Sequence, residues 1–253
     1  MTTSKPDFIV PDWPSPAGIR AAFTLRAGGV SAPPFDTFNI AAHVGDDSNA
    51  IAGNRARLRE SLALPAEPVW LEQVHGHRVV DLDSQTSRAS LGPADAAIAR
   101  SPGRVCAIQV ADCMPVLFAA ADGSVIGAAH AGWRGLAGGV LESTARAMKA
   151  AAGDLIAWMG PAIGPAHFEV GEEVRAAFLA ADSGASAAFT ANERGRWQCD
   201  LYALARRRLA AMGVTAVYGG GWCTYADAAR FFSYRRDGRC GRMAALIWRH
   251  SQG

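Results

Sequence analysis

Residues 105–135 read VCAIQVADCMPVLFAAADGSVIGAAHAGWRG and carry the strongest fold signal in the chain. This stretch holds three apolar runs with the length and composition of buried strands, at residues 105–110, 116–120 and 124–130. The Asp122-Gly123 pair between the last two runs predicts a hairpin, because Gly readily adopts the positive φ angles of a tight turn. We therefore expect a buried sheet that is at least partly antiparallel.

Outward from this stretch, strands and helices mix without a strict β-α-β rhythm. Further strands are predicted at residues 19–25, 78–82, 94–99, 155–159, 214–218 and 242–248, and helices at residues 48–62, 135–152, 170–181 and 201–212. Ser48 and Asp200 are the expected N-caps of two of these helices. Residues 182–197 are polar and predict a surface excursion. The fold class that follows is α/β, a single domain with mixed sheets and outer helices.

Composition limits the classes of protein to consider. The chain has 253 residues, of which 50% are hydrophobic and 19% charged, and its net charge is only +2. These values indicate a globular protein and give no reason to expect a nucleic-acid partner, and Arg206–Arg208 is interpreted as a solvated helix face. We expect an extended N-terminal segment over residues 1–19 and one domain over residues 20–250. No apolar stripe demands a second copy, so a monomer is expected.

Five widely spaced cysteines argue against a disulfide framework and for a reducing compartment. The N-terminus lacks the apolar core of a signal peptide. The chain also lacks an apolar stretch of about 18 residues, so no membrane span is expected. Together these features predict a cytoplasmic protein without a membrane partner.

Three short words, QVHG, ADCMP and HAGWRG, contribute His75, Cys113 and His130. Two imidazoles and one thiol form a zinc donor set that is one ligand short of tetrahedral, and an open position is what a catalytic metal requires. Each residue alone is more often an ordinary core or surface residue. His77 is an alternative to His75, since it lies only two positions further on.

These words belong to a longer ordered set: TLRAGGVS, FNIAAHVGDD, WLEQVHG, VADCMPVLF, AAHAGWRG, MGPAIG, FEVG, CT and FFSYRRDG. The set resembles the laccase-domain family, whose members are variously described as multicopper polyphenol oxidases, peptidoglycan editing factors and purine nucleoside phosphorylases. The resemblance covers roughly residues 20–248. It implies a layered α/β/β/α fold like that of a cysteine hydrolase, with zinc on His75, Cys113 and His130. It also brings in a metal-free alternative, in which Cys113 is a nucleophile and His130 its base.

Other polar residues in these words are candidate substrate ligands. The candidates for binding phosphate or the nucleoside are Arg26, Asn39, His43, Gln73 and Arg134. An arginine guanidinium binds phosphate through a planar pair of N–H donors, whereas amide and imidazole groups suit ribose hydroxyls or a base edge. Asp95 or Asp112 is expected to orient a ligand histidine by accepting a hydrogen bond from it.

The leading functional hypothesis is a zinc-dependent purine nucleoside phosphorylase. By the same resemblance it would convert adenosine, inosine or methylthioadenosine and phosphate into the free base and ribose 1-phosphate, and adenosine deaminase activity is a further expectation. Three alternatives stay open: a copper-dependent polyphenol oxidase, since imidazole and thiolate also bind Cu²⁺; a hydrolase that edits peptidoglycan precursors; and a metal-stabilised binding module without activity.

Overall fold

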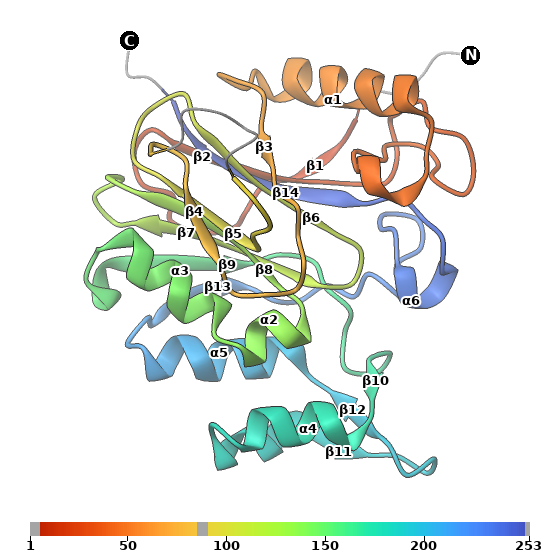
Figure 1. Cartoon of the computed structure of the whole chain (residues 1–253), viewed down its shortest axis with the longest axis vertical. Helices are drawn as coiled ribbons and strands as arrows, with labels where there is room; N and C mark the ends of the chain where they lie inside the picture. The colour runs from red at the N-terminus through yellow and green to blue at the C-terminus, as the bar shows by residue number, and fades with distance from the viewer. Residues whose placement is uncertain (1–5, 85–90, 251–253) are drawn as a thin grey trace.

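Two mixed β-sheets lie face to face in the computed structural model, which describes residues 6–84 and 91–250 (Figure 1). The five-stranded sheet has the order β1 (Phe8–Ile9), β2 (Ile19–Thr24), β14 (Met243–Arg249), β6 (Val105–Val110) and β3 (Val69–Trp70). The six-stranded sheet has the order β13 (Ala216–Gly219), β9 (Leu155–Met159), β7 (Met114–Ala120), β8 (Ile126–Ala131), β5 (Ala96–Ala99) and β4 (Val79–Asp81).

Helices cover the outer face of each sheet. The helix α1 (Ser48–Leu62) lies on the five-stranded sheet, whereas α2 (Trp133–Ala137), α3 (Val140–Met148) and α5 (Leu201–Ala211) lie on the six-stranded sheet (Figure 1). A smaller unit projects beyond α5 and consists of α4 (Glu172–Leu179), the 3-10 helix Ser183–Ala188 and a three-stranded sheet of β10 (Glu169–Val170), β12 (Trp197–Cys199) and β11 (Phe189–Ala191). Short helices at Ala42–Val44, Ala152–Asp154 and Tyr234–Asp237 (α6) complete the fold.

The strand β7 shows how one sequence serves two cores. Its side chains alternate, as the period of two in a strand requires. Val116 and Phe118 face the core beneath the helices, whereas Leu117 and Ala119 face the core between the two sheets. A third core lies between α1 and the five-stranded sheet and includes Leu58 and Leu246. The predicted α/β class and the α/β/β/α order of layers are confirmed.

The Asp122-Gly123 hairpin is also confirmed. The strands β7 and β8 pair antiparallel, the N–H of Gly123 donates to the carbonyl of Ala120, and Gly123 has a φ of +70°.

The prediction of a single helix over residues 135–152 is wrong. The chain breaks it at Gly138 and Gly139, where Gly139 has a φ of +90°, into α2 and α3. Gly lacks the Cβ that makes this backbone conformation costly, and it also destabilises a helix interior.

Residues 182–197 were expected to form only a surface excursion. Instead they contain the 3-10 helix Ser183–Ala188 and supply strand β11 of the small sheet, and Trp197 begins β12.

The N-cap of α1 is Asp47 rather than Ser48, because the Asp47 carboxylate accepts a hydrogen bond from the N–H of Ala50. The N-cap role of Asp200 is confirmed, through its hydrogen bond to the N–H of Ala203.

The connections at one end of the sheets determine where the candidate ligands lie. Only residues 111–113 link β6 in one sheet to β7 in the other. The register of β7 and β8 pairs Met114 with Ala131 and Pro115 with His130. Because β3 runs parallel to β6, the segment that follows β3 emerges at the same end. The fold therefore brings three distant parts of the chain to one place.

The helices within residues 6–84 and 91–250 do not meet the requirements for crossing a bilayer. None of them combines the necessary length and apolarity.

Candidate metal centre

His75, Cys113 and His130 meet at the junction between the two sheets. One ligand atom from each of the three residues can be chosen so that all three atoms lie within 4.8 Å of one another. Cys113 Sγ is 3.8 Å from His75 Nε2, and the two imidazole rings meet edge to face with centroids 4.8 Å apart. His75 is exposed, Cys113 is partly exposed and His130 is buried, so the cluster is open to solvent on the His75 side.

The carboxylate of Asp95 positions two of the three ligands. It accepts hydrogen bonds from the backbone N–H groups of Val74 (3.2 Å), His75 (2.8 Å) and Gly76 (2.7 Å), and its Oδ1 lies 2.8 Å from Nδ1 of His130. Asp95 has no solvent exposure. A histidine that donates Nδ1–H to a carboxylate has its Nε2 free for a metal. The expectation that Asp95 orients a ligand histidine agrees with this geometry.

The bonds to Asp95 also stabilise an unusual backbone. His75 has a φ of +62°, in the left-handed region that residues with a Cβ seldom adopt. This conformation costs roughly 1–2 kcal/mol. The three N–H groups that converge on one carboxylate offset that cost and turn the His75 ring towards Cys113. His77 stays outside the cluster, which leaves His75 as the candidate ligand on this loop.

The charges of Cys113 and His130 support each other. Burial disfavours the thiolate, but the positive charge and hydrogen bond of His130, together with those of His75, outweigh burial and lower the pKa of Cys113 to about 6. Burial likewise disfavours the imidazolium, and the thiolate of Cys113 and the carboxylate of Asp95 outweigh it and raise the pKa of His130 to about 9. Without a metal, the pair is therefore a thiolate and an imidazolium at neutral pH.

The donor set fits a zinc ion. Usual Zn–S and Zn–N bond lengths with a tetrahedral angle place sulfur and nitrogen about 3.6 Å apart, close to the 3.8 Å between Cys113 Sγ and His75 Nε2. Metal binding would take the Nε2 proton of His130, since a ligand imidazole is neutral. The geometry does not distinguish zinc from copper.

Gly132 provides the space in which the ligands meet. A Cβ at this position would lie 2.8 Å from Cys113 Sγ and 3.1 Å from Cδ2 of His75. A Cβ at Gly135 would lie 2.8 Å from the carbonyl oxygen of Gly76. The two glycines of the HAGWRG word therefore let α2 pack directly on the His75 loop.

Three of the predicted substrate ligands have their polar atoms engaged by the protein. Arg26 donates to the carbonyls of Ala228 and Asp36 and pairs with the Asp36 carboxylate at 3.2 Å. Gln73 exchanges two hydrogen bonds with the backbone of Gln109, so it extends the pairing of β3 with β6. These contacts give Arg26 and Gln73 a structural role.

Asn39 is fully buried, and its side chain is likewise occupied. Its Nδ2 donates to Asp46 and to the carbonyl of Ala41, and its Oδ1 accepts from the N–H groups of Ala41 and Arg242. Its expected contact with a ribose hydroxyl stays a prediction. The polar character that suggested a substrate contact serves loop structure here.

His43 and Arg134 are the two exposed members of the predicted substrate set. Burial and the nearby charges of Arg242 and Arg55 lower the pKa of His43, which keeps its imidazole neutral. Arg134 lies on α2, four residues after His130, with its guanidinium 4.4 Å from the centre of the Trp133 ring. It forms no side-chain hydrogen bond with any other residue that the structure describes, so its donors are available to an anion.

Asp112, the other candidate for orienting a histidine, has different partners. Its carboxylate accepts from the hydroxyl of Thr224 and from the N–H of Arg235. The expectation that it orients a histidine is therefore wrong. Sequence reasoning gave no role to Thr224 or Gly132, and the only available signal was that both lie inside words of the resemblance.

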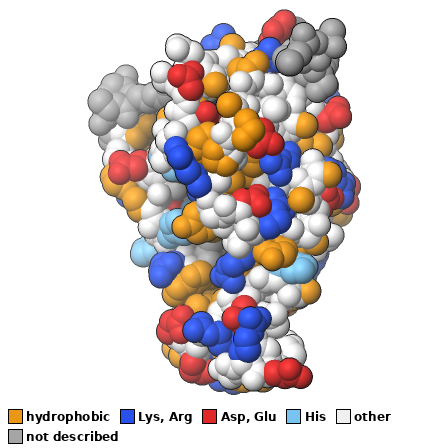
Figure 2. All heavy atoms as spheres, turned by 90° about the vertical axis from the view of Figure 1, so that its right-hand side faces the viewer, with side chains coloured by type: hydrophobic (Ala, Val, Ile, Leu, Met, Phe, Trp, Pro, Cys, Tyr) orange, Lys and Arg blue, Asp and Glu red, His pale blue; other side chains and the backbone are white. Residues whose placement is uncertain are grey.

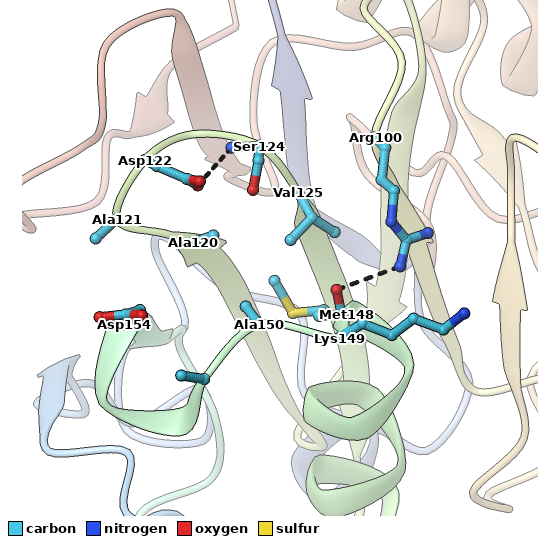
Figure 3. A pocket seen from close by; sticks show the side chains of 11 residues that line it. Arg100, Ala120, Ala121, Asp122, Ser124, Val125, Met148, Lys149, Ala150 and Asp154 are labelled. Atoms are coloured by element: carbon cyan, nitrogen blue, oxygen red, sulfur yellow. Dashed lines mark hydrogen bonds between the residues drawn. The ribbon is translucent and has the colours of Figure 1, made fainter.

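A cavity of about 510 Å³ lies at the far end of the same hairpin and does not include the cluster. Lys149 and Arg100 lie at one side, Asp122 and Asp154 at the other (Figure 3). Arg100 already pairs with Asp81 and donates to the carbonyls of α3. The length of β7 separates this cavity from Cys113 by about 20 Å. On the face over α6, Lys and Arg side chains are spread from top to bottom (Figure 2).

We predict that Gly132→Ala weakens metal binding at least about tenfold, the scale of a displaced ligand environment. The added Cβ must push Cys113 or His75 aside. Gly153→Ala is the matched control, because nothing lies within 4 Å of a Cβ there. The measurement is zinc affinity by competition with a chromophoric chelator. Equal affinities for the two variants would contradict the described packing.

We also predict that iodoacetamide alkylates Cys113 of the metal-free protein with a midpoint near pH 6, because the thiolate is the reactive form. Peptide mass spectrometry separates Cys113 from the buried thiols, among which Cys199 has its pKa raised by burial to about 12. His130→Gln should move the Cys113 midpoint upward, since it removes the main favourable charge. A midpoint above pH 8 in the unmodified chain would refute the ion pair.

Known proteins resemble this chain over nearly its whole length. The family described as multi-copper polyphenol oxidoreductase laccase matches residues 20–250. A Pseudomonas aeruginosa protein named Purine nucleoside phosphorylase PA4543 is 52% identical, over 95% of this chain and 98% of its own. Escherichia coli Purine nucleoside phosphorylase YfiH is 50% identical, with the same coverage.

Solved structures agree. The Neisseria meningitidis protein NMB0706 is 43% identical and superposes with a TM-score of 0.92, covering 96% of this chain and 99% of its own. YlmD from Geobacillus stearothermophilus is 34% identical, with a TM-score of 0.84 and 93% coverage of both chains. The chain therefore belongs to the multi-copper polyphenol oxidoreductase laccase family, as the resemblance of its ordered words indicates.

Proposed function

We propose that this protein is an enzyme that cleaves purine nucleosides with phosphate, using zinc held by His75, Cys113 and His130. The observation that carries the proposal is the identity of 50–52%, over 95% of the chain, to relatives named purine nucleoside phosphorylase. The open three-residue donor cluster supports the assignment of that activity to a metal-dependent site. Zinc bound there would supply Lewis acidity to an oxygen in the fourth position.

In this reaction a phosphate oxygen bonds to the anomeric carbon of the ribose as the bond from that carbon to the purine nitrogen breaks. The purine keeps the bonding electron pair and gains a proton, and ribose 1-phosphate is the second product. The residues of the chain supply binding and orientation. Asp95 accepts from Nδ1 of His130 and so directs its other nitrogen at the centre. The exposed guanidinium of Arg134 is suited to one face of the phosphate.

The other activities implied by the resemblance have weaker support. Only the family description names a copper oxidoreductase, and the chain holds six histidines, few for a set of several coppers. Adenosine deamination and editing of peptidoglycan precursors are not in the names of the relatives cited above. The thiolate–imidazolium pair keeps a metal-free nucleophile as an alternative. Metal analysis of protein produced without added zinc or copper would distinguish a zinc site, a copper site and a metal-free nucleophile.

We predict that the purified protein forms adenine from adenosine, or hypoxanthine from inosine, only when phosphate is present. Cys113→Ser should lower kcat/KM at least about 100-fold, since it replaces the soft thiolate donor. Cys240→Ser, at a thiol outside the cluster, is the control. Base release that persists in Cys113→Ser after removal of metal would rule out the proposed site.

A second expectation concerns phosphate. Arg134→Ala should raise the KM for phosphate about tenfold or more, as the loss of a charge-assisted hydrogen bond implies. The KM for the nucleoside and the zinc content should change little. Arg146→Ala, an exposed arginine on the neighbouring helix α3, is the control. If only the nucleoside KM responds to Arg134→Ala, the assignment of Arg134 to phosphate is wrong.

A further inference from the structure

Asp112 precedes the candidate ligand Cys113 and has a strained backbone. Its φ is +87°, in the left-handed region, although it carries a Cβ. Asp and Asn tolerate this conformation better than most residues, because their short polar side chains can form local hydrogen bonds. Residues 111–113 must carry the chain from one sheet to the other, and the turn at Asp112 provides the change of direction. The orientation of Cys113 therefore depends on how firmly Asp112 is fixed.

Three segments of the chain fix Asp112. Its Oδ1 accepts from the hydroxyl of Thr224 at 2.6 Å, and its Oδ2 accepts from the N–H of Arg235 at 2.7 Å. Its carbonyl accepts from the N–H of Ile163 at 2.9 Å. Asp112 is buried and Thr224 has no exposure, so water does not compete effectively for these hydrogen bonds.

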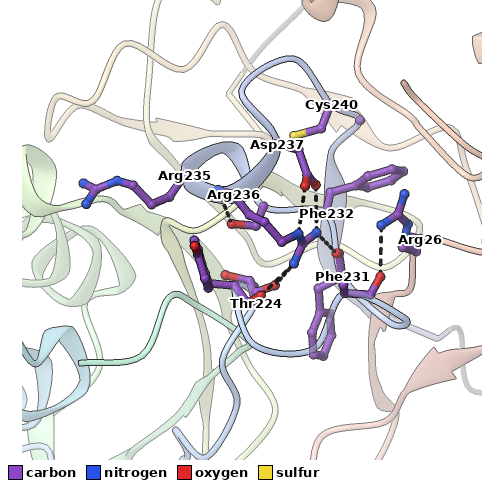
Figure 4. Close-up of polar contacts among 12 residues, drawn as sticks. Arg26, Thr224, Phe231, Phe232, Arg235, Arg236, Asp237 and Cys240 are labelled. Carbon is purple, nitrogen blue, oxygen red and sulfur yellow. Dashed lines mark hydrogen bonds and ion pairs between the residues drawn. The ribbon is translucent and has the colours of Figure 1, made fainter. Parts of the chain in front are cut away.

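Thr224 is itself held on both sides. Its N–H donates to the carbonyl of Ala162, and its carbonyl accepts from Arg236 at 2.8 Å. The guanidinium of Arg236 also binds the carbonyls of Tyr225 and Phe231 and the carboxylate of Asp237, so all of its nitrogens donate to protein (Figure 4). The hydroxyl of Thr224 therefore comes from a rigid loop and can hold the Asp112 carboxylate in place.

From this arrangement we propose that Asp112, fixed by the Thr224 hydroxyl, is a positioning residue for the thiolate of Cys113. This inference rests on the metal site of the proposed function. Asp112 is not itself a ligand, because both of its oxygens are occupied. Asp112 acts on Cys113 through the backbone that joins them, whereas Asp95 bonds directly to His75 and His130. A buried hydrogen-bonding partner one step removed from a metal ligand typically changes metal affinity 10- to 100-fold when it is lost.

The test compares two buried threonines. Thr224→Val keeps the side-chain shape but removes the hydroxyl, whereas Thr224→Ser keeps the hydroxyl and should rescue. Thr144→Val is the matched control, because Thr144 is also unexposed and donates one short hydrogen bond, of 2.7 Å, to the carbonyl of Val140 in α3. The readouts are zinc affinity by chelator competition, the absorption spectrum of the Co²⁺-loaded protein, and the melting temperature.

We expect Thr224→Val to lower zinc affinity about tenfold and to change the thiolate-to-cobalt absorption. Thr224→Ser and Thr144→Val should keep the original affinity and spectrum, although Thr144→Val should lower the melting temperature as Thr224→Val does. Asp112→Asn is the second test variant, to be used if Thr224→Val does not fold. Asn accepts the positive φ but offers one acceptor oxygen instead of two, so it too should weaken zinc binding.

Equal zinc affinity and cobalt spectra in Thr224→Val and Thr144→Val would overturn the inference, since the Asp112 contacts would then be structural only. An unmodified protein that takes up neither zinc nor cobalt would also overturn it. An unmodified protein that binds zinc but releases no purine base would contradict only the proposed function, because affinity and spectrum are measured without turnover.

Discussion

The carboxylate of Asp95 is the contact on which the candidate centre depends. A fully buried carboxylate is costly unless its lone pairs are satisfied, and here three backbone N–H groups and one imidazole satisfy them. The same contacts lower the pKa of Asp95, although burial alone would raise it. Because one anion binds both the loop of His75 and the ring of His130, two ligands separated by 55 residues in the chain have a fixed mutual orientation.

The charge balance of the centre follows from that anion. Cys113 as thiolate and Asp95 as carboxylate place two negative charges around the buried ring of His130, which makes its protonated form favourable. A divalent cation bound here would replace this proton as the source of positive charge, since thiolate and carboxylate attract a cation strongly in a poorly solvated place. The arrangement that stabilises a proton in the metal-free protein is thus also suited to a metal ion.

Local sequence patterns predicted much of the fold, but few of the contacts that hold the candidate metal ligands in place. The bounds of α1, β6 and β9 follow from caps, apolar periodicity and turn residues, which act within a few positions. The prediction of one helix gave too little weight to the adjacent Gly138 and Gly139, a dipeptide that marks turns. The triad His75, Cys113 and His130 was identified from donor chemistry and the resemblance. For polar groups such as Asn39 the sequence predicts a substrate contact, but it does not reveal whether the side chain faces a ligand or a neighbouring loop. The bond between Asp112 and Thr224 spans 112 residues, beyond the reach of any local pattern.

The left-handed backbone conformations of His75 and Asp112 explain why loops rather than regular strands present the candidate ligands. In a regular strand successive side chains point to opposite faces, whereas His75 and Cys113 both lie where the chain passes from the five-stranded sheet to the six-stranded sheet. A positive φ at His75 and at Asp112 redirects each chain by a single residue. Such a conformation persists only where the surroundings over-determine it. A buried carboxylate does so in both cases, from across the fold at His75 and from the strained residue itself at Asp112. At His75 and Asp112 the hydrogen bonds of a buried carboxylate therefore offset the strain of the backbone.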